Sequence, residues 1–236
     1  MGGIMKFANK AFDRAFSGLI SWQLWLFALV THLVVDLALL GSEAVVEQED
    51  FYTALGLAAL VAVIVAQWKF TRAFGEAPPE QHGSVGAWFG WTVVAFIPAV
   101  IILIAVIWYL GVDAIEDPPA TRSIMIGMAA VVALLSPVLV HASGRAINAN
   151  GPSLTERFRG CQQFFFPLAL GYFVISAGCW ALGDWLLTFV EPSLVDPVAV
   201  GLSIGSALCY FVAFFWTTSL LTLAWLRIDK GRLATS

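Results

Sequence analysis

Residues 85–111 read VGAWFGWTVVAFIPAVIILIAVIWYLG, without a single charged side chain. At about 1.5 Å per residue, a helix of this length is longer than the roughly 30 Å hydrocarbon core of a bilayer. Lipid offers no hydrogen-bond partner to an open backbone, so helices are the default spanning element. The stretch therefore predicts a transmembrane helix. It is too long and too evenly apolar to be a strand of a membrane barrel.

Similar apolar runs occur on both sides of this stretch. Together they predict six spans, at residues 19–40, 51–70, 85–111, 124–142, 164–190 and 198–226. The chain of 236 residues is 60% hydrophobic and only 12% charged, whereas a soluble domain carries about 25% charged residues. The first run is longer than a signal-peptide core, which indicates an uncleaved first helix. We expect residues 1–236 to form a single polytopic, all-α integral membrane domain.

The charged residues outside the runs separate by sign. Eleven of the 12 lysines and arginines lie on one side of the six predicted spans, and only Arg122 lies on the other. By the positive-inside rule, the basic side is cytoplasmic. We therefore expect both termini in the cytoplasm and a multi-pass protein of a bacterial-type inner (plasma) membrane. Five arginines are predicted at the cytoplasmic interface: Arg14, Arg72, Arg145, Arg157 and Arg159.

A short motif recurs on the basic side. The sequences FDRAF at residues 12–16 and FTRAF at residues 70–74 share four of five residues, and each precedes an odd-numbered span. A third Arg-Ala pair, at residues 145–146, precedes the fifth span. The pattern suggests three repeated helical hairpins, because parallel repeats are known in membrane folds. The alternative is that interfacial segments favour arginine and aromatic residues independently.

The connector between the fourth and fifth spans contains a helix start. Ser153 is followed three residues later by Glu156, which is the spacing of a capping box. We expect a short helix from residue 154 to about residue 164, at the membrane interface. Within the spans, Pro98, Pro137 and Pro167 each remove a backbone hydrogen bond, so each can kink its helix.

Small residues in the spans fit two different motifs. Residues 201–205, GLSIG, match the G-x-S-x-G pattern of a nucleophile elbow, which requires a strand before the serine. Here the motif lies in an apolar helix, where G-x-x-x-G spacing lets helices approach closely. We expect helix packing at Gly201 and Gly205, and likewise at Gly86 and Gly90. We find no phosphate-binding loop and no paired acids, so we expect no enzymatic activity and no catalytic residues.

His32 and Asp36 are the clearest intramembrane polar pair, and their i, i+4 spacing places them on one helix face. Ionisable residues within a span are costly, so the default hypothesis is a proton relay, an ion site or a cofactor ligand. The structural alternative is a neutral His32 bonded to Asp36 or to another helix, with Asp36 reaching water. A single pigment ligand at His32 stays open. We predict no metal site.

One connector and the last span carry a family resemblance. The connector contains Gly-Arg-Ala at residues 144–146, Gly-Pro-Ser-Leu at residues 151–154 and then Arg157, and the last span ends in LAWLR at residues 223–227. In these features the chain resembles bacterial six-helix membrane proteins, including the membrane domain associated with some glycerophosphodiester phosphodiesterases and related uncharacterised families. The phosphodiesterase catalytic domain is absent, so the resemblance implies a fold and no activity.

Three classes of function fit these patterns. The one we favour is a non-catalytic accessory or scaffold subunit within a larger membrane complex, respiratory, photosynthetic or other, because the spans are nearly featureless and rich in phenylalanine and tryptophan. The second is a small transporter or channel with a polar site at His32 and Asp36, and the third is a lipid- or pigment-binding membrane protein. We expect membrane lipids and other membrane subunits as partners, and no nucleic acid. The sequence requires no cofactor.

Overall fold

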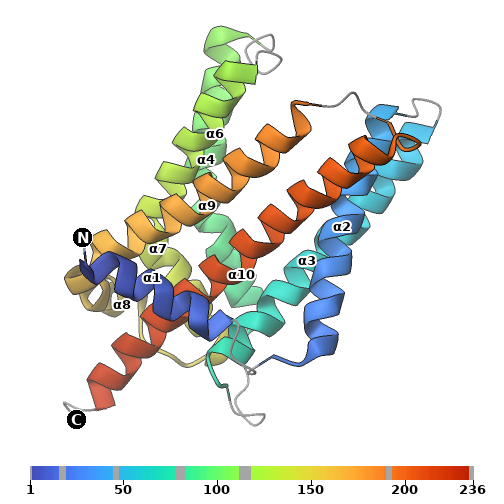
Figure 1. Ribbon diagram of the computed structural model, residues 1–236. Helices are drawn as coiled ribbons and strands as arrows, with labels where there is room; N and C mark the ends of the chain where they lie inside the picture. The colour runs from blue at the N-terminus through green and yellow to red at the C-terminus, as the bar shows by residue number, and fades with distance from the viewer. Residues whose placement is uncertain are drawn as a thin grey trace. The chain divides into compact units, whose positions relative to one another are not determined.

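The computed structural model describes residues 2–15, 20–44, 48–77, 83–111, 118–189 and 193–233. Within these residues every regular element is a helix, as the sequence predicted. The order is α1 (Gly2–Ala15), α2 (Trp22–Ala44), α3 (Glu49–Phe74), α4 (Val85–Leu110), α6 (Pro118–Leu134), α7 (Ser136–Ile147), α8 (Leu154–Cys161), η2 (Gln162–Phe164), α9 (Phe165–Leu187) and α10 (Pro197–Leu233) (Figure 1). Phe16 of the first repeated motif and the start of the first predicted span lie outside the described residues.

Five helices are long and apolar enough to cross a membrane, and the pair α6–α7 adds a sixth if it counts as one broken span. These helices suggest a multi-pass membrane protein, whereas the exact number of spans, their orientation and the hairpin repeat stay predictions. Among the helices that extend past the ends of the predicted spans, α3 continues to Phe74 and α10 to Leu233. Their last turns contain lysine and arginine, which lower the hydropathy but are good helix formers.

The fourth predicted span is bent. Its two halves, α6 and α7, meet at Leu135 at an angle of 62°. Pro137 lies in the first turn of α7, so its ring and its missing N–H account for the break. By contrast, α4 continues through Pro98. Pro167 lies in the first turn of α9, where a helix needs no intrahelical N–H donor. Of the three predicted kinks, the one at Pro137 coincides with a sharp bend, whereas Pro167 follows the 3₁₀ turn η2.

The chain folds into two compact units. The first unit comprises Met1–Leu19, Thr71–Ala177 and Trp216–Ser236, and the second unit comprises Ile20–Phe70 and Gly178–Phe215. The helices α3, α9 and α10 contribute residues to both units.

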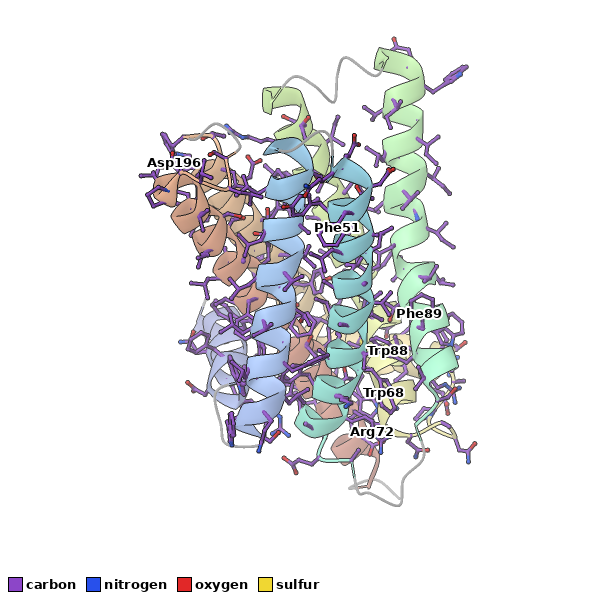
Figure 2. The ribbon with its side chains drawn as sticks, turned by 90° about the vertical axis from the view of Figure 1, so that its right-hand side faces the viewer. Phe51, Trp68, Arg72, Trp88, Phe89 and Asp196 are labelled. Atoms are coloured by element: carbon purple, nitrogen blue, oxygen red, sulfur yellow. The ribbon has the colours of Figure 1, made fainter. Side chains whose placement is uncertain are left out.

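The core of the first unit forms where α4 packs against α6 and α7. Ala95 and Ala99 of α4 are completely buried there. Helices in lipid associate through close packing, so small side chains are favourable at such a contact. Trp88 is 4% exposed, whereas its neighbour Phe89 is 46% exposed. Figure 2 shows both residues near the start of α4, which therefore has one packed face and one open apolar face.

The second unit holds an aromatic cluster and a close helix pair. The Trp25 ring stacks on Phe215 with a centroid distance of 3.9 Å, and Phe70 meets the same ring edge-on at 4.3 Å. Between α2 and α3, Gly41 lies so close to Tyr52 that an added Cβ would be 2.5 Å from the ring. These contacts fix α2 and α3 against the first half of α10.

Acidic side chains gather at one end of the second unit. The acids Glu49 and Asp50 begin α3. In Figure 2, Phe51 lies toward one end of this helix and Trp68 toward the other, and Asp196 lies toward the same end as Phe51. The acidic residues in the first turn of α3 and just before α10 therefore share one end of the unit.

Candidate functional site

Asp36 of α2 is a buried acid in the second unit. Its side chain is 8% exposed and lies next to Ser206 of α10, which is completely buried. Cys209 and Tyr210 are also close enough to interact with Asp36 electrostatically. Within the described residues, however, neither Asp36 Oδ2 nor Ser206 Oγ has a hydrogen-bond partner within 3.5 Å. The two side chains are therefore close enough to interact but form no hydrogen bond of good geometry.

A glycine on α9 makes room for this arrangement. A Cβ atom at Gly183 would lie 3.2 Å from Ser206 Oγ and 3.2 Å from Tyr210 Cζ. The next residue, Asp184, is close enough to Tyr210 to interact with it electrostatically. Ser206 and Tyr210 are four residues apart on α10 and so share one face. We call the group formed by Asp36, Asp184, Ser206, Cys209 and Tyr210 the Asp36 cluster.

His32 lies one turn before Asp36 but belongs to a different environment. Its Nδ1 is 2.7 Å from the Ala28 carbonyl oxygen. The ring meets Phe211 and Phe214 edge-on, at centroid distances of 5.5 and 5.0 Å. In the part of the chain that the structure describes, no hydrogen bond joins His32 to Asp36. His32 therefore packs against aromatic rings, and a pigment bound to it stays a prediction.

Sequence reasoning found Asp36 but missed Ser206 and Tyr210. The GLSIG motif stops at Gly205, one residue before the serine that lies next to the acid. The available signal was the pair of hydroxyl side chains four residues apart in an otherwise apolar span. Only the packing of α2 against α10 shows that this pair belongs to Asp36.

The first of the predicted interface arginines, Arg14, ties α1 to the end of α3. Its Nε donates to the Phe74 carbonyl oxygen at 3.0 Å, and its Nη2 pairs with Glu76 at 2.6 Å. Glu76 has a left-handed φ of 50°, which costs a residue with a side chain about 1–2 kcal/mol. The two bonds from Arg14 stabilise this strained turn after α3.

Arg72 and the segment after it are bound to the end of α7. Arg72 Nη1 donates to the Ala146 carbonyl oxygen at 3.0 Å, and the Ser84 N–H donates to the Arg145 carbonyl oxygen at 2.9 Å. A Cβ atom at Gly83 would lie only 1.7 Å from the Ala146 oxygen. Figure 2 shows Arg72 at the end of α3. The arginine of each of the first two Arg-Ala motifs therefore donates to the next motif along the chain: Arg14 to Phe74, and Arg72 to Ala146.

Arg157 of α8 is buried inside the first unit, with 1% of its surface exposed. Its guanidinium carbon lies 5.5 Å from the centroid of the Trp225 ring, a cation–π distance. A Cβ atom at Gly144 would lie 3.3 Å from Arg157 Nη2 and 2.7 Å from the same tryptophan. Of the five predicted interface arginines, one is therefore buried, and Arg14, Arg72 and Arg145 are half-buried. Arg159 is exposed.

The four glycines predicted to pack helices differ in their surroundings. A Cβ atom at Gly205 would lie 3.1 Å from Leu186, so this glycine sits at the α9–α10 contact. Gly86, Gly90 and Gly201 have no neighbouring atom within 4 Å of such a Cβ among the described residues. The space beside these three glycines is open among the described residues, and helix packing at them stays a prediction.

Metal binding was not expected, and the described residues contain no group of three or more histidine, cysteine or acidic side chains that could hold an ion. The comparisons with known proteins identify no family for the chain. The resemblance to the membrane domain of glycerophosphodiester phosphodiesterases stays a prediction, because no protein-family model, no curated protein and no solved structure matches the chain.

Proposed function

We propose that the protein is a small membrane transporter in which Asp36 binds and releases a proton. The observation that carries this proposal is the buried Asp36 Oδ2, which lies beside an equally unbonded Ser206 Oγ. The second function considered from the sequence was a transporter with an intramembrane polar site. The arrangement at Asp36 supports that function.

The energetics favour a reactive group over a structural one. A charged carboxylate within a span costs about 2.5–3.5 kcal/mol at the helix centre. A buried polar atom without a partner costs about a further 1–3 kcal/mol. A structural aspartate recovers such costs through hydrogen bonds, and Asp36 Oδ2 has none among the described residues. Binding a proton removes the charge and turns the carboxyl group into a donor for a neighbouring hydroxyl.

The neighbours of Asp36 suit proton transfer. Ser206 and Tyr210 each carry a hydroxyl that both donates and accepts hydrogen bonds, and they lie one turn apart on α10. Asp36 is eight residues before the end of α2, which is about 12 Å along the helix axis. A proton reaching Asp36 from that end of the helix crosses about two fifths of the hydrocarbon thickness. Ser206 lies beside Asp36, and Tyr210 lies one turn deeper along α10, so the two hydroxyls can pass a proton onward from Asp36.

Two measurements test the proposal on purified full-length protein. Infrared difference spectra between acid and alkaline buffer report the carbonyl band of a protonated carboxyl group in an apolar site. We expect such a band in the native protein and in Asp50→Asn, an exposed acid of the same unit, and not in Asp36→Asn. In liposomes, a potassium potential with valinomycin drives protons inward, and an enclosed pH dye reports their uptake.

The native protein and Asp50→Asn are expected to take up protons faster than empty liposomes, and Asp36→Asn is expected to match empty liposomes. Equal uptake by the native protein and Asp36→Asn would exclude Asp36 from the path. Native protein that shows the infrared band but no uptake would be a proton-binding protein, and the transport proposal would fail.

Purification in mild detergent distinguishes the transporter from the accessory subunit that the sequence favoured. Stoichiometric membrane subunits that co-purify with the chain, seen on native gels and identified by mass spectrometry, would support it. A homogeneous protein of this chain alone would count against it. Absorption spectra of the same sample test the pigment-binding alternative at His32.

A further inference from the structure

An open hollow of about 850 Å³ lies in the first unit, between α8 and η2 on one side and the last turns of α10 on the other. It is independent of the Asp36 cluster, which belongs to the second unit. Its wall combines charged, polar and apolar side chains: Glu156, Arg159, Gln163, Phe164, Arg227 and Ile228. The hollow therefore has the mixed lining of a site for an amphipathic ligand.

The close approach of two helices brings its arginines together. A Cβ atom at Gly160 would lie 2.8 Å from Ile228, so α8 contacts α10 through a glycine. Arg159 precedes this glycine and Arg227 precedes the isoleucine, and both arginines line the hollow. Because Arg157 lies two residues away on α8, it faces the opposite side, where it is buried. The helix thus assigns one arginine to the core and one to the hollow.

The acid in the wall has a bond of its own. Glu156 Oε2 accepts from the Ser153 N–H at 2.8 Å and from the Ser153 hydroxyl at 2.9 Å, and Ser153 Oγ accepts from the Glu156 N–H. This is the capping box predicted from the sequence, and the structure confirms it. The capping box holds the carboxylate at the start of α8. The lining carries two guanidinium groups against this one carboxylate, a net positive charge.

The position of the hollow fits a lipid headgroup. The candidate spans that include α9 and α10 run over Leu154–Leu187 and Pro197–Asp229, so the hollow lies at their ends. Phe164 and Ile228 supply an apolar wall next to the arginines. Phe158 and Phe166, at 40% and 67% exposed, flank the same turn. Planar guanidinium groups bind phosphate through paired hydrogen bonds, which suits a headgroup held at this depth.

We propose that the hollow binds the phosphate group of an anionic phospholipid. Arg159 and Arg227 hold the phosphate, Gln163 donates to it, and the acyl chains lie along Phe164 and Ile228. A free phosphate ion offers the same charge but has no use for the apolar wall, so the lipid is the source that the lining favours.

Native mass spectrometry of the full-length protein in detergent tests this assignment, with equal amounts of phosphatidylglycerol and phosphatidylcholine as probes. The double variant Arg159→Gln/Arg227→Gln removes both charges, and Arg122→Gln is the matched control elsewhere in the chain. The measured quantity is the ratio of bound phosphatidylglycerol to bound phosphatidylcholine. We expect this ratio to be about thirtyfold higher in the native protein and in the control than in the double variant, because two arginines near an anionic lipid contribute about 1 kcal/mol each. The variant Arg159→Lys/Arg227→Lys is expected to keep only part of this preference.

Three outcomes would overturn the proposal. The double variant could retain the full preference for phosphatidylglycerol, or the native protein could show none. The third outcome comes from calorimetry with inorganic phosphate. If phosphate binding depended on both arginines but the preference for phosphatidylglycerol did not, the hollow would be a site for the free ion. Should the double variant fail to fold by circular dichroism, the single variant Arg159→Gln gives the same comparison, because Arg159 is an exposed side chain.

Discussion

Replacing Gly83 by alanine tests how the segment before α4 is held against the end of α7. The new Cβ atom would lie 1.7 Å from the Ala146 oxygen and 2.7 Å from Arg72 Nη1. Both the bond from Arg72 to Ala146 and the bond from the Ser84 N–H to Arg145 must lengthen or break to admit it. A neutral hydrogen bond contributes about 0.5–1.5 kcal/mol and one from a charged group about 1.5–3 kcal/mol. Alanine recovers about 0.4–1 kcal/mol by restricting the unfolded chain.

We therefore expect Gly83→Ala to lower the free energy of unfolding by about 1–4 kcal/mol, after subtraction of that gain. The matched control is Gly90→Ala, seven residues later in α4, where no atom lies within 4 Å of the added Cβ. There alanine is expected to stabilise the helix by roughly 0.5–1 kcal/mol. Unfolding in mixed micelles of increasing SDS content, followed by circular dichroism, measures both. If the two variants agreed within about 0.5 kcal/mol, the close contact at Gly83 would be refuted.

Three further substitutions have outcomes that the structure specifies. Asp36→Leu is expected to abolish proton uptake while stabilising the fold by up to about 1–3 kcal/mol, because it removes an unbonded polar group; a loss of stability in the SDS titration would show that the carboxyl group is bonded after all. Arg72→Ala is expected to cost about 1.5–3 kcal/mol and Arg72→Lys less, since a lysine keeps the charge but not the geometry; native stability of both would contradict the tie to Ala146. Pro137→Ala is expected to straighten the α6–α7 bend and to lengthen the distance between spin labels at Ile126 and Asn150, whereas an unchanged distance would assign the bend to packing.

The helices could be predicted because hydropathy is a local property of the sequence. The run at residues 85–111 became α4, and Ser153 with Glu156 formed the capping box, since both signals depend on neighbours within one turn or one span. The break at Leu135 was only partly foreseeable. Pro98 and Pro137 look alike in the sequence, yet α4 continues through the first and the helix stops at the second.

The polar contacts were beyond sequence reasoning for a different reason. Arg14 and Arg72 donate to backbone carbonyl oxygens, and a carbonyl group is present at every residue, so its position carries no sequence signal. The arginines looked like interface residues because only their charge is visible in the sequence. Likewise, Asp36 and Ser206 lie 170 positions apart, and their proximity depends on how α2 packs against α10.

The bonded arginines also have a consequence for synthesis of the chain. Arg14 and Arg72 bind carbonyl oxygens that lie 60 and 74 residues further along the sequence. A ribosome adds about 5–20 residues per second, so each arginine waits about 3–15 s for its acceptor. The hydroxyl of Ser219 donates to the carbonyl oxygen of Ala11 across 208 residues. The helix α1 is therefore held in two stages, first by the bond from Arg14 to Phe74 and much later by the bond from Ser219 of α10.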